Sequence, residues 1–420
     1  MKVLVIGSGG REHALIWKLS QSKRVSRIYA APGNPGMKDL AEIVDIKSTD
    51  IIDLADFAKE EDIHLTIVGP EQPLALGIVD EFNSQNLRIF GPNQKAAMIE
   101  SSKSFAKEFM KKNNIPSSEF IVFHSPMDAI AHLDKATFPL VIKADGLAGG
   151  KGVYICKNKE EGEESVREIM LEGKFGKAGE KVIVEEFLQG QEMTFMVISD
   201  GRRVIPLATS MDYKKILEND KGPNTGGMGA ISPAPQTSKA LFNIVMKTII
   251  MPTITGLRFE NKEFRGILYA GLMVTPDGPK VLEFNARFGD PETQPVMLRL
   301  KSDIMELLDA ATDEGLLEVV PEWDEKVSAC VVLASKGYPG KSESGKKIQG
   351  LERAKSLSVE IFHAGTSFDG KGFSTAAGRV LDVCATGVTL KETMNKIYDA
   401  ISFITFDNMV FRRDIGWSKR

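Results

Sequence analysis

Short runs of apolar residues alternate with amphipathic stretches over the first hundred residues of the chain. Glu12–Leu19 and Ile51–Lys59 have the apolar spacing of helices that cover a sheet. The runs beside them have the length of strands, and they are Val3–Ile6, Arg27–Ala30, Leu65–Val68 and Leu87–Phe90. This alternation predicts a doubly wound parallel sheet. Gly- or Pro-rich loops follow these strands, and ligands of such sheets bind at the carboxyl ends of the strands.

The pattern changes after a helical stretch over Gln94–Asn113. A helix is expected near Glu160–Leu171, and the strands predicted around it are Phe120–Phe123, Leu140–Lys143, Val153–Cys156 and Val182–Glu186. Gly173, Gly176 and Gly179 lie close together between this helix and the last strand, which indicates a loose loop.

Two further pairs of strands follow, separated by a long glycine-rich loop from Asp212 to Pro235 and a helix over Leu241–Met251. The strands are Met193–Ser199, Val204–Ala208, Gly266–Val274 and Lys280–Asn285. Pro276-Asp277-Gly278-Pro279 joins the last two and is typical of a hairpin turn. We expect no apolar run of the roughly 18 residues that a membrane helix needs.

Near Pro321 the pattern changes again. Three strands and a helix are predicted there, at Val327–Ala334, Ser358–His363, Gly378–Thr386 and Leu390–Phe403. They indicate a small α+β unit. The chain is therefore expected to be a multidomain protein of α/β and α+β class, divided into residues 1–101, 102–320 and 321–420.

Composition restricts the function. The 420 residues correspond to about three domains. Lys and Arg number 53 against 57 Asp and Glu, so the chain lacks the basic excess that a general nucleic-acid or anionic-membrane binder needs. Cys156, Cys330 and Cys384 form no CxxC pair, which favours a reducing, cytoplasmic compartment with the cysteines as buried hydrophobes. The five histidines show no zinc-ligand spacing.

Two glycine-rich loops suit anionic ligands. Gly7-Ser8-Gly9-Gly10 lies between a strand and a helix, where backbone N–H groups bind phosphate. Glu12 replaces the third glycine of a dinucleotide fingerprint, so a ligand other than NAD fits better, and a turn that only permits tight packing is the alternative. Residues 143–153 carry Lys143, Lys151 and four glycines between two strands, which suits a mobile cover over a triphosphate; a flexible hairpin with solvated lysines is the alternative.

Three other segments carry polar groups in suggestive positions. Glu185 and Glu192 flank a short turn that could pair with an adenine edge and bind ribose hydroxyls, although an acidic strand end is more often solvated. Glu283 and Asn285 alternate on a strand, so both point to one face and could hold Mg²⁺, with Arg287 beside them to neutralise a phosphoryl group; a polar outer strand face is the alternative. The third segment, residues 222–230, is dense in glycine and suggests backbone contact with a small anion.

Together these segments resemble the phosphoribosylamine–glycine ligase family of the ATP-grasp superfamily over nearly the whole chain. The most specific motifs are Asn224-Thr225-Gly226-Gly227-Met228-Gly229 and Arg287-Phe288-Gly289-Asp290-Pro291-Glu292-Thr293-Gln294. The resemblance implies a central ATP-grasp core with a mobile lid at about residues 120–190. It also implies ligation of glycine to 5-phosphoribosylamine, with ATP and Mg²⁺ or Mn²⁺, by way of glycyl phosphate in purine synthesis.

The resemblance also implies roles for individual residues. The catalytic residues would be Lys143, Asp212 and Arg287. ATP would be bound by Lys103, Lys143, Gly149, Gly150, Lys151, Glu185, Glu186, Leu188 and Glu192. The metal would be bound by Glu283 and Asn285. The substrates would be bound by Gly9, Gly10, Asp212, Asn224, Thr225, Gly226, Gly227 and Arg287. We expect a monomer that binds small molecules, neither nucleic acid nor membrane, and that makes transient contact with neighbouring enzymes of the pathway.

The chain departs from the family pattern at two places. Met211-Asp212-Tyr213-Lys214 stands where the family has Gln-Asp-His-Lys, and Ala377-Gly378-Arg379 stands where it has Gly-Gly-Arg. Three alternatives stay open: another ATP-grasp ligase or carboxylase, an inactive nucleotide-binding protein, and a nicotinamide oxidoreductase. The two specific motifs weigh against the first, the intact Lys143, Glu283, Asn285 and Arg287 against the second, and the broken fingerprint against the third.

Overall fold

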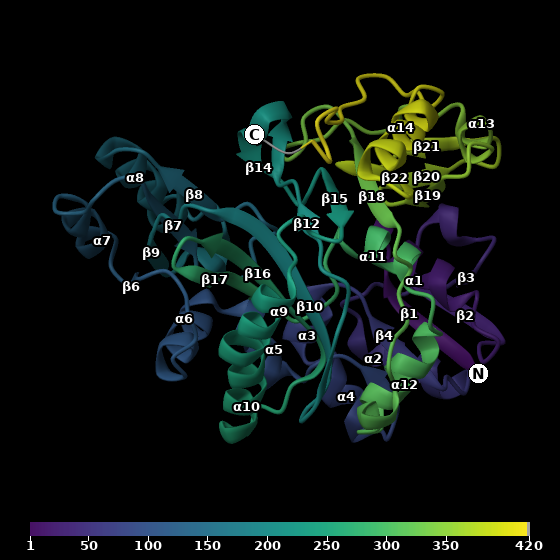
Figure 1. Cartoon of the computed structure of the whole chain (residues 1–420), viewed down its shortest axis with the longest axis horizontal. Helices are drawn as coiled ribbons and strands as arrows, with labels where there is room; N and C mark the ends of the chain where they lie inside the picture. Colours follow the sequence, from purple (N-terminus) through teal and green to yellow (C-terminus); the bar gives the residue numbers. More distant parts are fainter. Residues whose placement is uncertain (418–420) are drawn as a thin grey trace.

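A computed structural model describes residues 1–417 of the chain. The first hundred residues form a five-stranded parallel sheet in the order β3-β2-β1-β4-β5 (Figure 1). The strands are β1 (Lys2–Gly7), β2 (Arg27–Pro32), β3 (Glu42–Ile43), β4 (Leu65–Val68) and β5 (Ile89–Phe90). The helices are α1 (Gly10–Leu19), α2 (Ile51–Glu60), α3 (Glu71–Leu76), α4 (Ile78–Ser84) and α5 (Gln94–Ser101). The predicted doubly wound sheet is confirmed.

The helix predicted over Gln94–Asn113 is two helices. α5 ends at Ser101, and α6 (Lys103–Lys112) begins after Ser102. Ser102 has an extended backbone, with φ −137° and ψ 109°, and its hydroxyl accepts a hydrogen bond from the N–H of Phe105. A serine in this position caps the N-terminus of the second helix.

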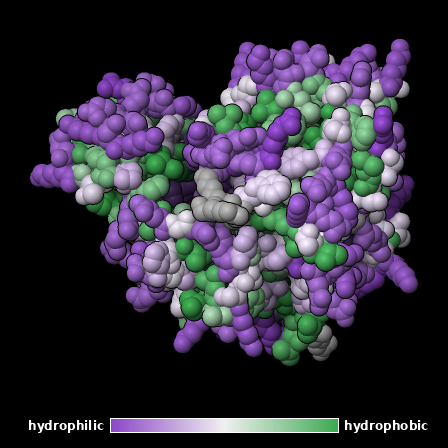
Figure 2. All heavy atoms as spheres, turned by 45° about the horizontal axis from the view of Figure 1, so that its top comes forward, coloured by the Kyte–Doolittle hydropathy of each residue, from purple (hydrophilic) through white to green (hydrophobic). Residues whose placement is uncertain are grey.

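The next unit is a lobe with its own four-stranded antiparallel sheet, in the order β6-β9-β7-β8. Its elements are β6 (Phe120–Phe123), α7 (Pro126–Leu133), β7 (Leu140–Ala144), β8 (Val153–Cys156), α8 (Lys159–Val166) and β9 (Val182–Glu186). A separate small apolar core that includes Leu133, Ile142 and Val184 holds it together. Figure 2 shows it at the left as a largely hydrophilic projection from the body. The sequence pattern missed α7.

A second antiparallel sheet, in the order β11-β10-β16-β17, forms the centre of the molecule. Its strands are β10 (Gln191–Asp200), β11 (Val204–Pro206), β16 (Arg265–Thr275) and β17 (Gly278–Asn285). Phe195, Leu268 and Phe284 pack in one core with side chains from the first hundred residues. The central sheet and the N-terminal unit are therefore packed together as one body, whereas the lobe has its own core.

Residues Lys239–Phe259 form one continuous helical stretch, which corrects the shorter helix expected over Leu241–Met251. It comprises α9 (Lys239–Val245), a π-helical turn (Met246–Ile250) and α10 (Met251–Phe259). By length and composition alone this stretch could cross a membrane, so the expectation of no such run was wrong. Its inward side chains, among them Val245 and Leu257, pack in the main core. Core helices of globular proteins meet the same criterion.

The loop predicted from Asp212 to Pro235 contains four short strands. They are β12 (Met211–Asp212), β13 (Lys215–Leu217), β14 (Lys221–Asn224) and β15 (Gly229–Ser232). β13 and β14 form a small hairpin, and β15 pairs with β18 (Val327–Ala334) of the C-terminal unit. The long-loop expectation was wrong: β13 and β14 pair locally, and β15 pairs with β18, a partner distant in sequence that local pattern does not reveal.

The C-terminal sheet has the order β12-β15-β18-β22-β19, so it draws two of its strands from before residue 320. The remaining elements are α11 (Thr293–Arg299), α12 (Ile304–Thr312), α13 (Leu351–Lys355), β19 (Glu360–His363), β20 (Thr366–Phe368), β21 (Phe373–Thr375), β22 (Arg379–Gly387) and α14 (Leu390–Ile401). Cys330 lies directly opposite Cys384 in this sheet. All three cysteines are buried and unbridged, as expected.

The N-terminal and C-terminal units meet at a buried carboxyl group. Asp382 of β22 lies so close to the first glycine-rich loop that its Oδ2 would be 1.7 Å from a Cβ at position 10, which explains why glycine occurs there. Gln294 Nε2 donates hydrogen bonds to Asp382 Oδ2 (2.8 Å) and Asp290 Oδ1 (2.9 Å). Burial and the nearby Asp290 raise the pKa of Asp382 to about 7.

This raised pKa predicts how pH affects stability. The folded state holds a proton on Asp382 that the unfolded chain releases above its ordinary pKa of 3.8, so the contribution of this group falls as pH rises from about 4 to about 7. An Asp382→Asn variant keeps a hydrogen-bond acceptor and carries no charge. We expect its melting temperature, relative to the unmodified protein, to increase between pH 5 and pH 8 in calorimetry.

The control is Asp277→Asn, which removes an exposed carboxylate from the β16–β17 turn. Its melting temperature should differ from that of the unmodified protein by a similar amount at each pH. A pH-independent difference for Asp382→Asn would contradict the interpretation.

Candidate active site

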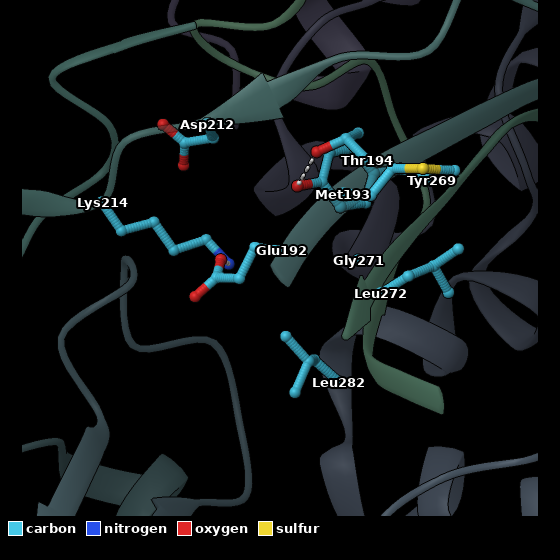
Figure 3. A pocket seen from close by; sticks show the side chains of 9 residues that line it. All are labelled: Glu192, Met193, Thr194, Asp212, Lys214, Tyr269, Gly271, Leu272 and Leu282. Carbon is cyan, nitrogen blue, oxygen red and sulfur yellow. Dashed lines mark hydrogen bonds and ion pairs between the residues drawn. The ribbon is translucent and has the colours of Figure 1, made fainter. Parts of the chain in front are cut away.

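A narrow pocket lies between the central sheet and residues 212–214. Its lining residues come from β10, β16, β17 and the stretch 212–214, and they are Glu192, Met193, Thr194, Asp212, Lys214, Tyr269, Gly271, Leu272 and Leu282 (Figure 3). The wall is apolar at Leu272 and Leu282 and charged at Glu192, Asp212 and Lys214. Such a mixture suits a small ligand held by a few polar groups.

Lys214 links two of the predicted site residues. Its Nζ lies 3.2 Å from Glu192 Oε2 and 3.8 Å from Glu283 Oε1. Figure 3 shows the ammonium and the Glu192 carboxylate pointing toward each other. Burial would lower the pKa of Lys214, but Glu192 and Glu283 hold it well above its usual value. Lys214 is therefore a fixed positive charge between the predicted ribose and metal ligands.

Asp212 carries an unsatisfied acceptor. Its Oδ1 is shielded from solvent and has no hydrogen-bond partner. Burial raises the pKa of this carboxyl group well above its usual value, and the neighbouring Glu292 adds to the effect. A buried oxygen without a donor is costly, and a bound cationic group would satisfy it.

The predicted phosphate-binding lysines lie around Glu283. Lys103 Nζ donates a hydrogen bond to the carbonyl of Gly146 at 3.0 Å, and Lys143 Nζ donates to the carbonyl of Leu282 at 3.0 Å. Burial opposes ionisation of Glu283, but Lys214, Lys143 and Lys103 lower the pKa of its carboxyl group below the usual value. Three lysines thus face this carboxylate, and two of them, Lys214 and Lys143, are also paired with Glu192 and Glu185.

The glycine-rich loop at residues 143–153, which is predicted to cover the triphosphate, approaches the loop at residues 224–227. Gly149 and Gly150 have φ values of +57° and +75°, which favour glycine. A Cβ at Gly150 would lie 3.5 Å from the carbonyl oxygen of Thr225. Lys151 is exposed. The structure thus brings together two loops that the sequence separates by more than seventy residues.

The predicted adenine-binding segment is partly buried. The Glu185 side chain is only 2% exposed, and its carboxylate contacts Lys107 and Lys143. Glu186 is exposed and Leu188 is buried. The Glu185 carboxylate is thus occupied by lysines, and its main chain lies between Phe120 of β6 and Val141 of β7 in the sheet of the lobe. Burial favours the neutral acid, but Lys143 and Lys107 hold the pKa of Glu185 below its usual value.

The predicted metal ligands are two oxygen donors on one face of β17. Glu283 faces Lys214, and Asn285 Oδ1 accepts a hydrogen bond from Arg287 Nη2 at 3.3 Å. Within residues 1–417 no group of three or more His, Cys, Asp or Glu side chains could hold a metal ion. Two hard oxygen donors fit a divalent cation that brings phosphate and water as its other ligands.

Arg287 is anchored by two carboxylates. Its Nε lies 3.3 Å from Glu71 Oε2, and its Nη2 lies 3.2 Å from Glu100 Oε1. Burial raises the pKa of Glu100 to about 7. Burial opposes the charge on Arg287, but Glu100 and Glu71 raise its pKa further above its usual value. These contacts fix the guanidinium beside Asn285.

The two loops predicted to bind substrate converge with residues from the C-terminal unit. Arg379 Nη1 donates to the carbonyl of Gly226 at 2.8 Å, and its Nη2 donates to Asp290 Oδ2 at 2.7 Å. A Cβ at Gly9 would lie 3.5 Å from Asp290 Oδ2. The Asn224–Gly227 segment and the Gly9–Gly10 segment therefore approach each other at Asp290.

Sequence reasoning missed several residues that build this site. They are Glu71, Glu100, Lys107, Asp290, Tyr338 and Asp382, and Lys214 and Arg379 were noted only as neighbours of motifs. Asp290 lies inside the most specific motif and could have been included on that basis. The other missed residues join the site only because segments distant in sequence meet in the folded chain.

Tyr213 and Ala377, which depart from the family pattern, do not line the pocket. The Tyr213 hydroxyl accepts a hydrogen bond from the N–H of Gly416, and its ring lies under the Arg412 guanidinium at 5.2 Å. Tyr213 therefore points away from the side of the segment that presents Asp212 and Lys214. Ala377 lies against Gly365, where a second Cβ would be 2.5 Å away.

Three family models together match most of the chain. They describe phosphoribosylglycinamide synthetase: its N domain at residues 1–100, its ATP-grasp (A) domain at 101–293 and its C domain at 328–418. Curated relatives named phosphoribosylamine–glycine ligase include proteins from Escherichia coli O6:H1 and Caldanaerobacter subterraneus. Both are 48% identical and cover 99% of this chain, and the chain covers 98% and 99% of them, respectively.

Two solved structures have a fold similar to that of this chain. The phosphoribosylamine–glycine ligase of Thermotoga maritima is 31% identical with a TM-score of 0.85, and the match covers 99% of this chain and all of that one. A biotin carboxylase of Campylobacter jejuni is 15% identical with a TM-score of 0.75, covers 99% of this chain and 94% of that one, and shows the shared fold alone. With models matching all three parts and relatives matching nearly full length, the chain belongs to the phosphoribosylamine–glycine ligase family of ATP-grasp proteins.

Proposed function

We propose that this chain ligates glycine to 5-phosphoribosylamine at the expense of ATP. The products are glycinamide ribonucleotide, ADP and phosphate, in purine biosynthesis. The observation that carries the proposal is the meeting of Gly9, Gly226 and Asp290 with Arg379, which joins the two most specific motifs in one site. The full-length relatives with this activity support it.

The reaction would proceed in two transfers. A glycine carboxylate oxygen attacks the γ-phosphorus of ATP, the bond to the β-phosphate oxygen breaks, and ADP leaves. The amine of phosphoribosylamine then attacks the carbonyl carbon of glycyl phosphate, the bond to phosphate breaks, and the nitrogen releases a proton. Such steps need positioning and charge neutralisation more than acid–base groups.

The nucleotide would lie between the lobe and the central sheet. Lys103, Lys143 and Lys151 would neutralise the phosphates, with Gly149 and Gly150 closing over them. Glu185, Glu186 and Leu188 would line the adenine, and Glu192 would accept bonds from the ribose hydroxyls. The position of Lys103, Lys143 and Lys214 around Glu283 supports this placement.

A divalent cation, Mg²⁺ or Mn²⁺, would be held by Glu283 and Asn285, because both donors are hard oxygens. When bound, it supplies charge neutralisation for the phosphoryl group in transfer. The anchored guanidinium of Arg287 lies beside Asn285 and would add a fixed positive charge.

Glycine would place its ammonium group on Asp212, because Oδ1 of this carboxyl group is enclosed and lacks a donor. Arg287 would orient the carboxylate and the acyl phosphate. Gly9, Gly10 and the Asn224–Gly227 loop would bind phosphoribosylamine through backbone N–H groups.

We also propose that residues 1–101, 102–320 and 321–420 are the three domains of the enzyme, and that a lid at about residues 120–190 closes over the nucleotide. The separate core of the lobe supports its motion as a lid. We further propose a cytoplasmic monomer that makes transient contact with neighbouring enzymes of the pathway.

The reaction class is tested by omitting each substrate in turn. We expect ADP release to require glycine, and hydroxylamine to trap glycyl hydroxamate when phosphoribosylamine is absent. ADP release that persists without glycine, or that depends on bicarbonate instead, would point to a different ATP-grasp reaction.

Lys143→Ala tests the phosphate contact. We expect kcat/KM to fall by about 10²–10³, because one fixed positive charge at the transferring phosphoryl group is lost. The fold should survive, since Lys107 still pairs with Glu185. Lys177→Ala, an exposed lysine of the same lobe, is the control. Normal turnover in a folded Lys143→Ala variant would remove this lysine from the mechanism.

Asp212→Asn tests the glycine contact. We expect the KM for glycine to rise by about 10–100-fold, because a hydrogen bond to a charged group is worth roughly 1.5–3 kcal/mol. The KM for ATP should change much less. Asp277→Asn again provides a control for removal of an exposed carboxylate. Equal effects on the two KM values would mean that Asp212 does not act on glycine.

A further inference from the structure

A buried lysine outside the predicted site holds the carboxylate that also contacts Lys143. Lys107 lies on α6, four residues after Lys103 and on the same face of the helix. Its side chain is 3% exposed, and its Nζ lies 2.9 Å from Glu185 Oε2. It also donates a hydrogen bond to Ser118 Oγ at 2.6 Å.

Glu185 receives three donors on a single oxygen. Lys143 Nζ lies 3.0 Å from the same Oε2, and the Ser118 hydroxyl donates to it at 2.8 Å. The other oxygen, Oε1, is buried without a partner. One carboxylate is therefore shared by two ammonium groups that come from different units, α6 of the body and β7 of the lobe.

The sharing leaves Lys143 incompletely satisfied. An ammonium group has three N–H donors, and Lys143 uses one for Glu185 and one for the carbonyl of Leu282. With two lysines on one carboxylate, the local charge is net positive. If Lys107 were absent, the full negative charge of Glu185 would attract Lys143 alone, in a buried environment where such attraction is strong.

We propose that Lys107 is a positioning residue for nucleotide binding: by sharing the Glu185 carboxylate, it keeps the Lys143 ammonium available to the phosphates of ATP. This proposal rests on the proposed function, in which Lys143 contacts those phosphates. Lys107 would act through Glu185 and Lys143 and would not touch the nucleotide phosphates itself.

The test compares four variants by steady-state kinetics of glycine-dependent ADP release and by melting temperature. Lys107→Met removes the shared charge, Lys107→Arg keeps it, and Lys107→Met/Glu185→Gln removes the carboxylate as well. Lys111→Met, an exposed lysine on the same helix, is the matched control.

We expect Lys107→Met to raise the KM for ATP about tenfold or more, which corresponds to the partial loss of one charge contact. The KM for glycine should stay within about twofold, and Lys107→Arg and Lys111→Met should stay close to the unmodified protein. The double variant should recover much of the ATP affinity, because no carboxylate then competes for Lys143.

A folded Lys107→Met variant with an unchanged KM for ATP would overturn the proposal, as would a double variant no better than Lys107→Met. If Lys107→Met does not fold, the double variant is compared with Glu185→Gln alone. Loss of Lys107 should then change the KM for ATP by no more than about twofold, and a tenfold change would overturn the proposal. Failure of the underlying function would appear separately, as an unchanged KM for ATP in Lys143→Ala.

Discussion

The contact between Arg379 and Asp290 is the interaction on which the geometry of the site depends. Arg379 begins β22 of the C-terminal sheet, and Asp290 follows β17 of the central sheet. The same guanidinium also binds the carbonyl of Gly226, whose N–H donates to the Tyr338 hydroxyl. The Arg379 guanidinium thus fixes three segments that are distant in sequence. The first glycine-rich loop packs against Asp290.

The charges of the site are arranged in compensated groups. Lys214 lies between Glu192 and Glu283, Arg287 between Glu71 and Glu100, and Glu185 between two lysines. Burying an ion is costly unless it is paired, so each group needs its partners in the absence of ligand. Lys103, Lys143 and Lys214 all face Glu283, and fixed charges of this kind stabilise charge that develops in a reaction without reorganising.

The sequence pattern predicted most of the regular elements. In a strand or helix with one buried face, the apolar residues recur with the period of that element, so the pattern identifies it. It failed where pairing partners are remote. β15 is a strand because β18 lies beside it, and the split at Ser102 follows from a serine cap inside an otherwise helical pattern. The helical stretch at residues 239–259 exceeded the prediction because it continues past Pro252, a residue type that usually ends a helix, directly after the π-helical turn Met246–Ile250.

By itself, the sequence determined the reaction class through its resemblance to the phosphoribosylamine–glycine ligase family. The glycine-rich loops, the paired Glu283 and Asn285 and the Arg287–Gln294 motif are contiguous segments, and their chemistry can be interpreted without knowing their neighbours. Only the tertiary structure decided which charges face one another. Lys107 and Glu185 are 78 positions apart, and Arg379 and Asp290 are 89 apart. No local period encodes such pairs, because a salt bridge depends on where two backbones meet and not on the residues beside them.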